Sequence, residues 1–140
     1  MEWIYDDGGR ANAGYKGTTG DCAVRSIAIV SGKKYQEVYD SINNLSLKEH
    51  KTRRKGISNA RLGVYPQTVK KYLFSLGMKW TPCMSIGSGC KYHLRAGELP
   101  SGKLLVNVSK HYTAVVDGII HDTFDPSREG TRCVYGYYSY

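Results

Sequence analysis

The sequence predicts an α+β fold in which N-terminal helices pack on one side of a C-terminal antiparallel β-sheet. Two observations support this prediction. Helical periodicity is confined to the first half of the chain, and short β-branched or aromatic runs bounded by Gly and Pro fill the second half. The 140 residues suit one domain and carry no internal repeat, so we expect a single domain spanning residues 1–140.

Three segments are predicted to be helices: 22–30, 35–43 and the stretch from Pro66 to Gly77. The first is apolar apart from Arg25 and Ser26, which suits a mostly buried helix. The second repeats apolar residues at i, i+3, i+4 and i+7 from Tyr35, which gives one amphipathic face. The third has Pro at its start and Gly at its end, an asymmetry typical of helices.

Five later runs are predicted to be strands: 78–80, 104–108, 112–116, 119–123 and 133–138. Residues 1–20 are rich in Gly, Asn, Asp and Thr and are expected to form an extended lead-in loop. Residues 47–63 show neither helical nor strand periodicity and contain many lysines and arginines, which indicates a basic surface loop.

A β-hairpin is predicted around Asp117-Gly118, the dipeptide that a two-residue type I′ turn favours. This turn fixes the register of the flanking strands. His111 and Asp122 then lie on the same face of the sheet as diagonal neighbours, close enough for their side chains to meet. Asp125 points the other way if the strand continues regularly, so Asp122 is the favoured carboxylate partner and Asp125 the alternative.

Cys22 is predicted to open the first helix, directly after Gly20 and Asp21. Asp21 is then the expected N-cap, which leaves the Cys22 amide free to donate to an oxyanion. The helix dipole lowers the pKa of a thiol at this position, whereas the Asp21 charge opposes a thiolate. Arg25 neutralises Asp21 in part, and we interpret it as the partner of a structural ion pair.

Together, Cys22, His111 and Asp122 provide a nucleophile, a general base and an orienting acid. Each residue also has a simpler interpretation. Most free cysteines are small buried hydrophobes, and a His or Asp near a strand end is commonly a polar end residue. The combination of the three, in this order, favours the catalytic interpretation.

The order of these elements resembles the papain-like cysteine peptidase superfamily. Gly20-Asp21-Cys22 starts a helix, His111 opens a hairpin and Asp122 follows on the returning strand. Bacteriocin-processing peptidases, cell-wall amidopeptidases of the NlpC type, ovarian-tumour-type deubiquitinases and small phage or bacterial proteins are similar in layout. The resemblance implies a papain-like fold, a peptide or protein substrate and hydrolysis through an acyl-enzyme, with no cofactor or metal.

The resemblance also concerns the oxyanion hole. Papain-like enzymes usually place a Gln six residues before the nucleophile, and this chain has Lys16 there. Lys16 and the Cys22 amide are therefore the candidate oxyanion donors. Asn12, Thr18 and Thr19 are alternatives for the side-chain donor.

Composition limits the setting of the protein. The net charge is +8 at pH 7 and the chain holds four cysteines. No apolar run approaches the roughly 18 residues that span a bilayer, so we expect a soluble protein without membrane contact. The N-terminus lacks the features of a signal peptide, which predicts a cytoplasmic location, in a bacterial host if the protein is phage-encoded, and four reduced thiols.

Three alternatives remain open. The same fold could act as a catalytically inactive binding module, such as a phage-encoded inhibitor. The basic run Lys48–Lys55 and the tyrosines could bind nucleic acid, which the positive charge allows but no recognised motif supports. A zinc site could use Cys83, Cys90 and His93 with Cys133 or His121, but this spacing matches no compact zinc motif.

Overall fold

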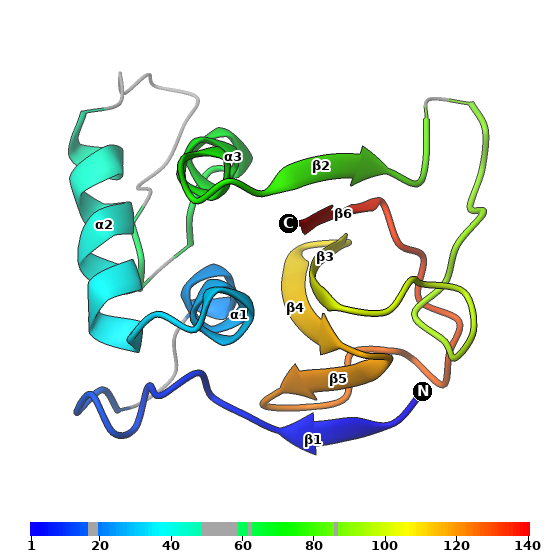
Figure 1. Ribbon diagram of the computed structural model, residues 1–140, viewed down its shortest axis with the longest axis horizontal. Coiled ribbons are helices and arrows are strands. Elements are labelled where there is room, and N and C mark those ends of the chain that lie inside the picture. Colours follow the sequence, from blue (N-terminus) through cyan, green and yellow to red (C-terminus); the bar gives the residue numbers. More distant parts are fainter. Residues whose placement is uncertain (17–19, 49–58, 62, 86) are drawn as a thin grey trace.

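The computed structural model describes residues 1–16, 20–48, 59–61, 63–85 and 87–140. Within these residues the fold is α+β, with three helices and a six-stranded mixed sheet (Figure 1). The predicted basic loop lies largely outside the described residues, and of the run Lys48–Lys55 only Lys48 is described.

The three helices form where the sequence predicts them: α1 is Cys22–Ser31, α2 is Tyr35–Leu47 and α3 is Pro66–Ser75. Gly32 follows α1 as its C-cap, and its left-handed φ of 73° suits a residue without a Cβ. α2 continues beyond the predicted end at residue 43 because Leu45 still packs against the core. Pro66 occupies the first turn of α3 as expected.

The sheet has the strand order β1-β5-β4-β3-β6-β2. Its strands are β1 Trp3–Tyr5, β2 Lys79–Pro82, β3 Lys103–Val108, β4 His111–Val116, β5 Ile119–Asp122 and β6 Gly136–Ser139. All neighbours pair antiparallel except β1 and β5, which pair in parallel. The prediction of a purely antiparallel sheet is therefore wrong at this edge, and residues 1–20 are not entirely loop.

The β4–β5 hairpin has the predicted register. Val116 pairs with Ile119, and Ala114 pairs with His121. Asp117 and Gly118 both have positive φ, 49° and 81°, as a type I′ turn requires.

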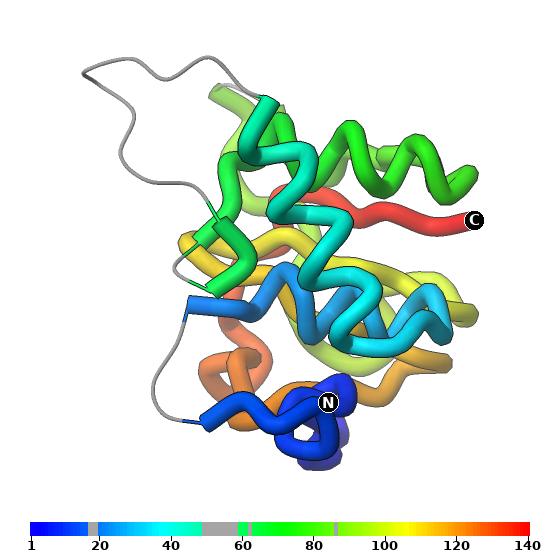
Figure 2. The backbone as a smooth tube through the Cα atoms, turned by 90° about the vertical axis from the view of Figure 1, so that its left-hand side faces the viewer, coloured from blue at the N-terminus to red at the C-terminus, as the bar shows by residue number. Residues whose placement is uncertain are grey.

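The sheet separates two hydrophobic clusters. The helices cover one face, where Ile27, Val38 and Leu73 are fully buried together with Leu105 of β3. Seen from the helical side, α1 and α2 lie in front of the strands (Figure 2). The second cluster contains Leu94, Leu104, Val106, Val115, Ile120 and Val134. No helix among the described residues is long and apolar enough to cross a membrane.

Cys90 and Cys133 form a disulfide, with a Cα–Cα distance of 5.8 Å. The prediction of four free thiols is therefore wrong for this pair, while Cys22 and Cys83 are free. The prediction considered only the redox environment and not which cysteines the fold brings together. A backbone bond from the Val134 amide to the Tyr92 carbonyl (2.9 Å) joins the two segments and places their cysteines side by side.

Candidate functional site

The N-terminus of α1 packs against the beginning of β4. The pairing of β4 with β5 covers only Ala114–Val116, so the first residues of β4 are not paired with β5. The Ser26 hydroxyl donates to the Tyr112 carbonyl at 3.0 Å and so ties the helix to the strand. This junction places the Cys22 thiol close enough to the His111 side chain and the Tyr112 backbone for both to lower its pKa.

His111 also contacts Asp122. Its Nε2 lies 2.7 Å from Asp122 Oδ2, and the side chains are only 10% and 3% exposed. The Phe124 ring packs against the imidazole with 5.0 Å between ring centroids. Because Nε2 is engaged with the carboxylate, Nδ1 is the ring nitrogen left for Cys22.

Asp122 is itself held at its second oxygen. Oδ1 accepts a hydrogen bond from the Thr123 amide at 2.7 Å and lies 3.6 Å from Arg25 Nη2. The alternative acid, Asp125, is exposed and accepts a bond from the Ser127 amide instead. The structure therefore brings Cys22, His111 and Asp122 together, and Asp125 pairs with the Ser127 amide and not with His111.

The three groups shift one another's pKa values. Burial alone would raise the pKa of the Cys22 thiol, but the hydrogen bond and charge of His111, the Tyr112 amide and Arg25 lower it overall. Burial would lower the pKa of His111, yet its bonds to Asp122 and Cys22 raise it to about 9. Burial opposes ionisation of Asp122 as well, but the hydrogen bond and charge of His111 and the bond from the Thr123 amide lower its pKa.

These directions favour a thiolate–imidazolium pair stabilised by an anionic carboxylate. A thiolate is the nucleophilic form of cysteine, and an imidazolium beside it can later protonate a leaving group. The arrangement is thus chemically suited to nucleophilic attack on a carbonyl.

Asp21 occupies the N-cap position but does not cap the helix with its side chain. The prediction of a side-chain cap is therefore wrong. The carboxylate instead pairs with Arg25, lies 3.4 Å from Arg10 Nε and accepts a bond from the Tyr35 hydroxyl at 2.6 Å. These partners come from residues distant in sequence as well as from the helix itself, and they turn the carboxylate away from the first helical amides.

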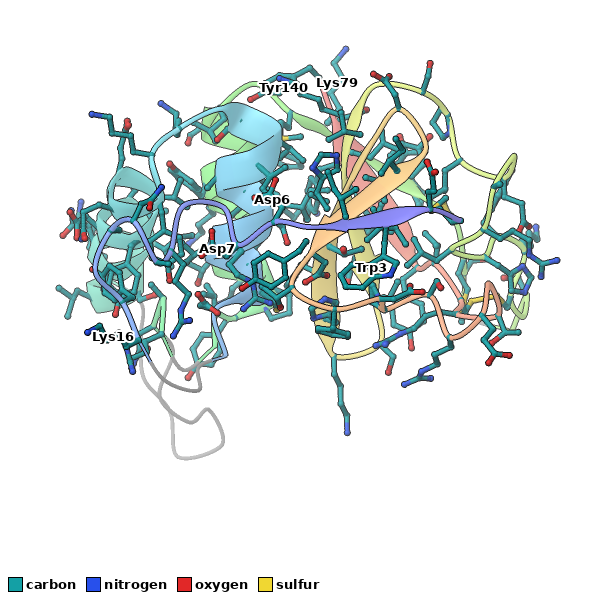
Figure 3. All side chains as sticks on the ribbon, turned by 90° about the horizontal axis from the view of Figure 1, so that it is seen from below. Trp3, Asp6, Asp7, Lys16, Lys79 and Tyr140 are labelled. Carbon is teal, nitrogen blue, oxygen red and sulfur yellow. A yellow bond between two sulfur atoms is a disulfide. The ribbon has the colours of Figure 1, made fainter. Side chains whose placement is uncertain are left out.

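A cleft of about 480 Å³ opens beside Cys22. Its lining residues are Gly20, Cys22, Ala23, Gly63, Val64, Pro66, Asn107, Val108, Lys110, His111, Tyr112 and Tyr135. Among the described residues, the lining includes neither Lys16 nor Asn12, and both are exposed. Figure 3 shows Lys16 at the periphery of the molecule. Thr18 and Thr19 lie outside the described residues.

Sequence reasoning missed Asn107 and Lys110 as residues of the cleft. Asn107 pairs with Tyr112 in the sheet and lies on the same side of β3 as the core residue Leu105. A polar residue in the apolar run LLVNV was the available signal. Lys110 directly precedes His111 and adopts a φ of 55° in the turn between β3 and β4, which no sequence pattern marked.

The residues of the zinc alternative other than the free Cys83 are engaged with other partners. Cys90 and Cys133 are bonded to each other, and His93 Nδ1 lies 3.3 Å from Glu98 Oε1. His121 Nδ1 lies 3.2 Å from Asp6. No cluster of three metal-binding side chains occurs in the part of the chain that the structure describes.

In comparisons with known proteins, no protein-family model, no curated protein and no solved structure matches the chain.

Proposed function

We propose that the protein is a cysteine hydrolase of papain-like type, most simply a peptidase or amidase, with Cys22 as nucleophile. The supporting observation is the His111–Asp122 hydrogen bond together with a Cys22 thiol whose pKa His111 lowers, both beside an open cleft. A helix-borne Cys followed by a strand-borne His and a partner carboxylate is the layout that the resemblance to papain-like peptidases implies.

In this mechanism, His111 accepts the proton of Cys22 and the thiolate attacks the carbonyl carbon of an amide. The tetrahedral intermediate collapses to an acyl-enzyme as imidazolium His111 protonates the departing amine. Water, deprotonated by His111, then attacks the acyl carbon and releases the carboxylic acid product and the free thiol. Asp122 orients the imidazole and stabilises its positive charge throughout.

The oxyanion that develops during the attack must be stabilised by hydrogen-bond donors. The amide of Cys22 is one, because the first amides of a helix have no intrahelical acceptor. For the second donor we favour the Asn107 carboxamide over Lys16, since Asn107 lines the cleft and Lys16 does not.

The first test compares the two free thiols of the native protein. Cys22 and Cys83 are alkylated with iodoacetamide between pH 4 and 10, and each site is quantified by peptide mass spectrometry. An ordinary thiol is only about 0.3% ionised at pH 6, so Cys22 should react at this pH at least about 100-fold faster than Cys83. Equal rates, or a Cys22 rate that His111→Ala leaves unchanged, would contradict the proposal.

The second test asks for turnover. Incubation with a peptide mixture should yield cleavage products that are absent with Cys22→Ala. The rate should fall at low pH as Cys22 gains its proton, and fall again above about pH 9 as His111 loses the proton that the leaving group needs. A reactive Cys22 without any cleavage or acyl transfer would favour the inactive binding module instead.

A further inference from the structure

A buried row of alternating charges runs behind the site. It passes from Arg10 to Asp21, then to Arg25, Asp122 and His111, each in contact with the next. The carboxylates of Asp21 and Asp122 are 0% and 3% exposed. Buried carboxylates at these positions require paired cations, because an isolated buried charge is costly.

Arg25 is the central link of this row. One of its terminal nitrogens pairs with Asp21 Oδ1, and the other lies 3.6 Å from Asp122 Oδ1. A planar guanidinium can bridge two carboxylates in this way, whereas a lysine ammonium cannot hold both at fixed separation. The side chain is 12% exposed, so water competes little for these contacts.

The bridge fixes the rotation of the Asp122 carboxylate. Arg25 and the Thr123 amide engage Oδ1, which leaves Oδ2 directed at His111. Arg25 is not among the described residues that line the cleft, so any effect it has on the reaction passes through Asp122 and through its charge near Cys22.

The N-terminal segment completes the row. Gly8 packs so closely on α1 that a Cβ there would approach the Arg25 carbonyl oxygen to 2.7 Å. This contact brings the following turn, and with it Arg10, onto Asp21. Tyr35 of α2 donates to the same carboxylate, so the N-terminal segment and α2 both hold Asp21 while it pairs with Arg25.

We propose that Arg25 is a positioning residue that links Asp21 to Asp122 and sets the orientation of the Asp122–His111 pair. This inference rests on the proposed cysteine hydrolase function. In this inference, Asp21 holds Arg25 through an ion pair. Its position directly before α1 had predicted a capping role instead.

The test compares Arg25→Lys with Arg10→Lys, since both arginines pair with Asp21 and Arg25 in addition contacts Asp122. Arg25→Lys should raise the pH midpoint of Cys22 alkylation by about half a unit to one unit, because the cation near the thiolate is displaced. It should lower kcat about tenfold with KM changed less than about twofold, as expected for a residue that does not touch substrate. Arg10→Lys, whose side chain pairs with Asp21 and not with Asp122, should shift the midpoint and kcat by much less than Arg25→Lys.

Equal effects of the two substitutions, on midpoint and on kcat, would reduce Arg25 to a structural ion pair and overturn the inference. Far-ultraviolet circular dichroism checks the fold of each variant. If Arg25→Lys unfolds, the double variant Asp21→Asn, Arg25→Gln removes both charges together and carries the same test. A wild-type Cys22 that titrates like an ordinary thiol would instead refute the proposed function itself, so the two failures are distinguishable.

Discussion

The two free cysteines lie in opposite environments. Cys22 stands at a helix N-terminus among an imidazole, an amide donor and a guanidinium, which lower the pKa of its thiol. Cys83 belongs to the cluster on the other face of the sheet, where burial among apolar side chains raises the pKa of its thiol. Both side chains are shielded from solvent to a large degree. The comparison teaches that polar partners, and not burial by itself, decide whether the pKa of a thiol is lowered.

The largest effect is expected from exchanging the two thiols for alanine in turn. Cys22→Ala should lower the rate of peptide cleavage at least about 10⁴-fold, because it removes the thiol on which the proposed acyl-enzyme forms. Cys83→Ala should change the rate by less than about twofold, since it removes a small apolar contact away from the cleft. Steady-state cleavage measured by chromatography checks both. Similar losses in the two variants would erase the distinction drawn between the thiols.

The next comparison is between Asp122, the last residue of β5, and Asp125, which follows it along the chain. Asp122→Asn should lower kcat about 10²- to 10⁴-fold, because an amide neither stabilises the imidazolium nor enforces the tautomer that directs Nδ1 at Cys22. Asp125→Asn should have little effect, as that side chain caps a turn through the Ser127 amide. Single-turnover kinetics of the purified variants measure the ratio. A greater loss with Asp125→Asn would reassign the third member of the triad.

The third comparison is between Asn107 and Lys16, the two candidates for the second oxyanion donor. Asn107→Ala should reduce kcat about 10²-fold with KM nearly constant, since one donor to the transition state is lost. Lys16→Ala should leave kcat unchanged. The kcat and KM of both variants on one peptide decide between the two donors, and the reverse pattern would restore the expectation from the sequence.

The smallest catalytic effect is expected at the disulfide. Replacing Cys90 and Cys133 with serine opens a loop with a sequence separation of 43, and the chain-entropy argument gives about 4 kcal/mol of lost unfolding free energy. Cleavage below the unfolding temperature should change by less than about twofold, because neither cysteine lines the cleft. Urea unfolding with and without reductant measures the stability. A large loss of activity in the folded variant would connect the disulfide to the site.

The helices, the hairpin and the meeting of His111 with Asp122 could be predicted because their signals are local. Pro66 marks a helix start, and Asp117-Gly118 fixes a strand register within a few residues. The strand at Trp3–Tyr5 could not be predicted. It has three exposed residues without alternation, and its partner β5 lies more than a hundred residues away along the chain.

The remaining errors in the site have the same origin. A residue directly before a helix favours a capping role for Asp21, but Arg10 and Tyr35 reach that carboxylate only through the tertiary fold. Likewise, the pairing of Cys90 with Cys133 depends on a bridge between distant segments, and the cleft position of Asn107 depends on which side of β3 the helices cover. Local patterns predicted that Cys22, His111 and Asp122 lie together, while long-range contacts determined the partners around them.

The parallel pairing of β1 with β5 has a consequence for the order in which the protein is made. Trp3 leaves the ribosome early, but its partner Ile120 is synthesised more than a hundred residues later. Such distant pairings close late, because a long loop must be ordered before any contact compensates for it. Cys22 therefore emerges long before His111 and Asp122 can reach it. The nascent chain carries an unactivated thiol, and the complete site can assemble only after Asp122 has been synthesised.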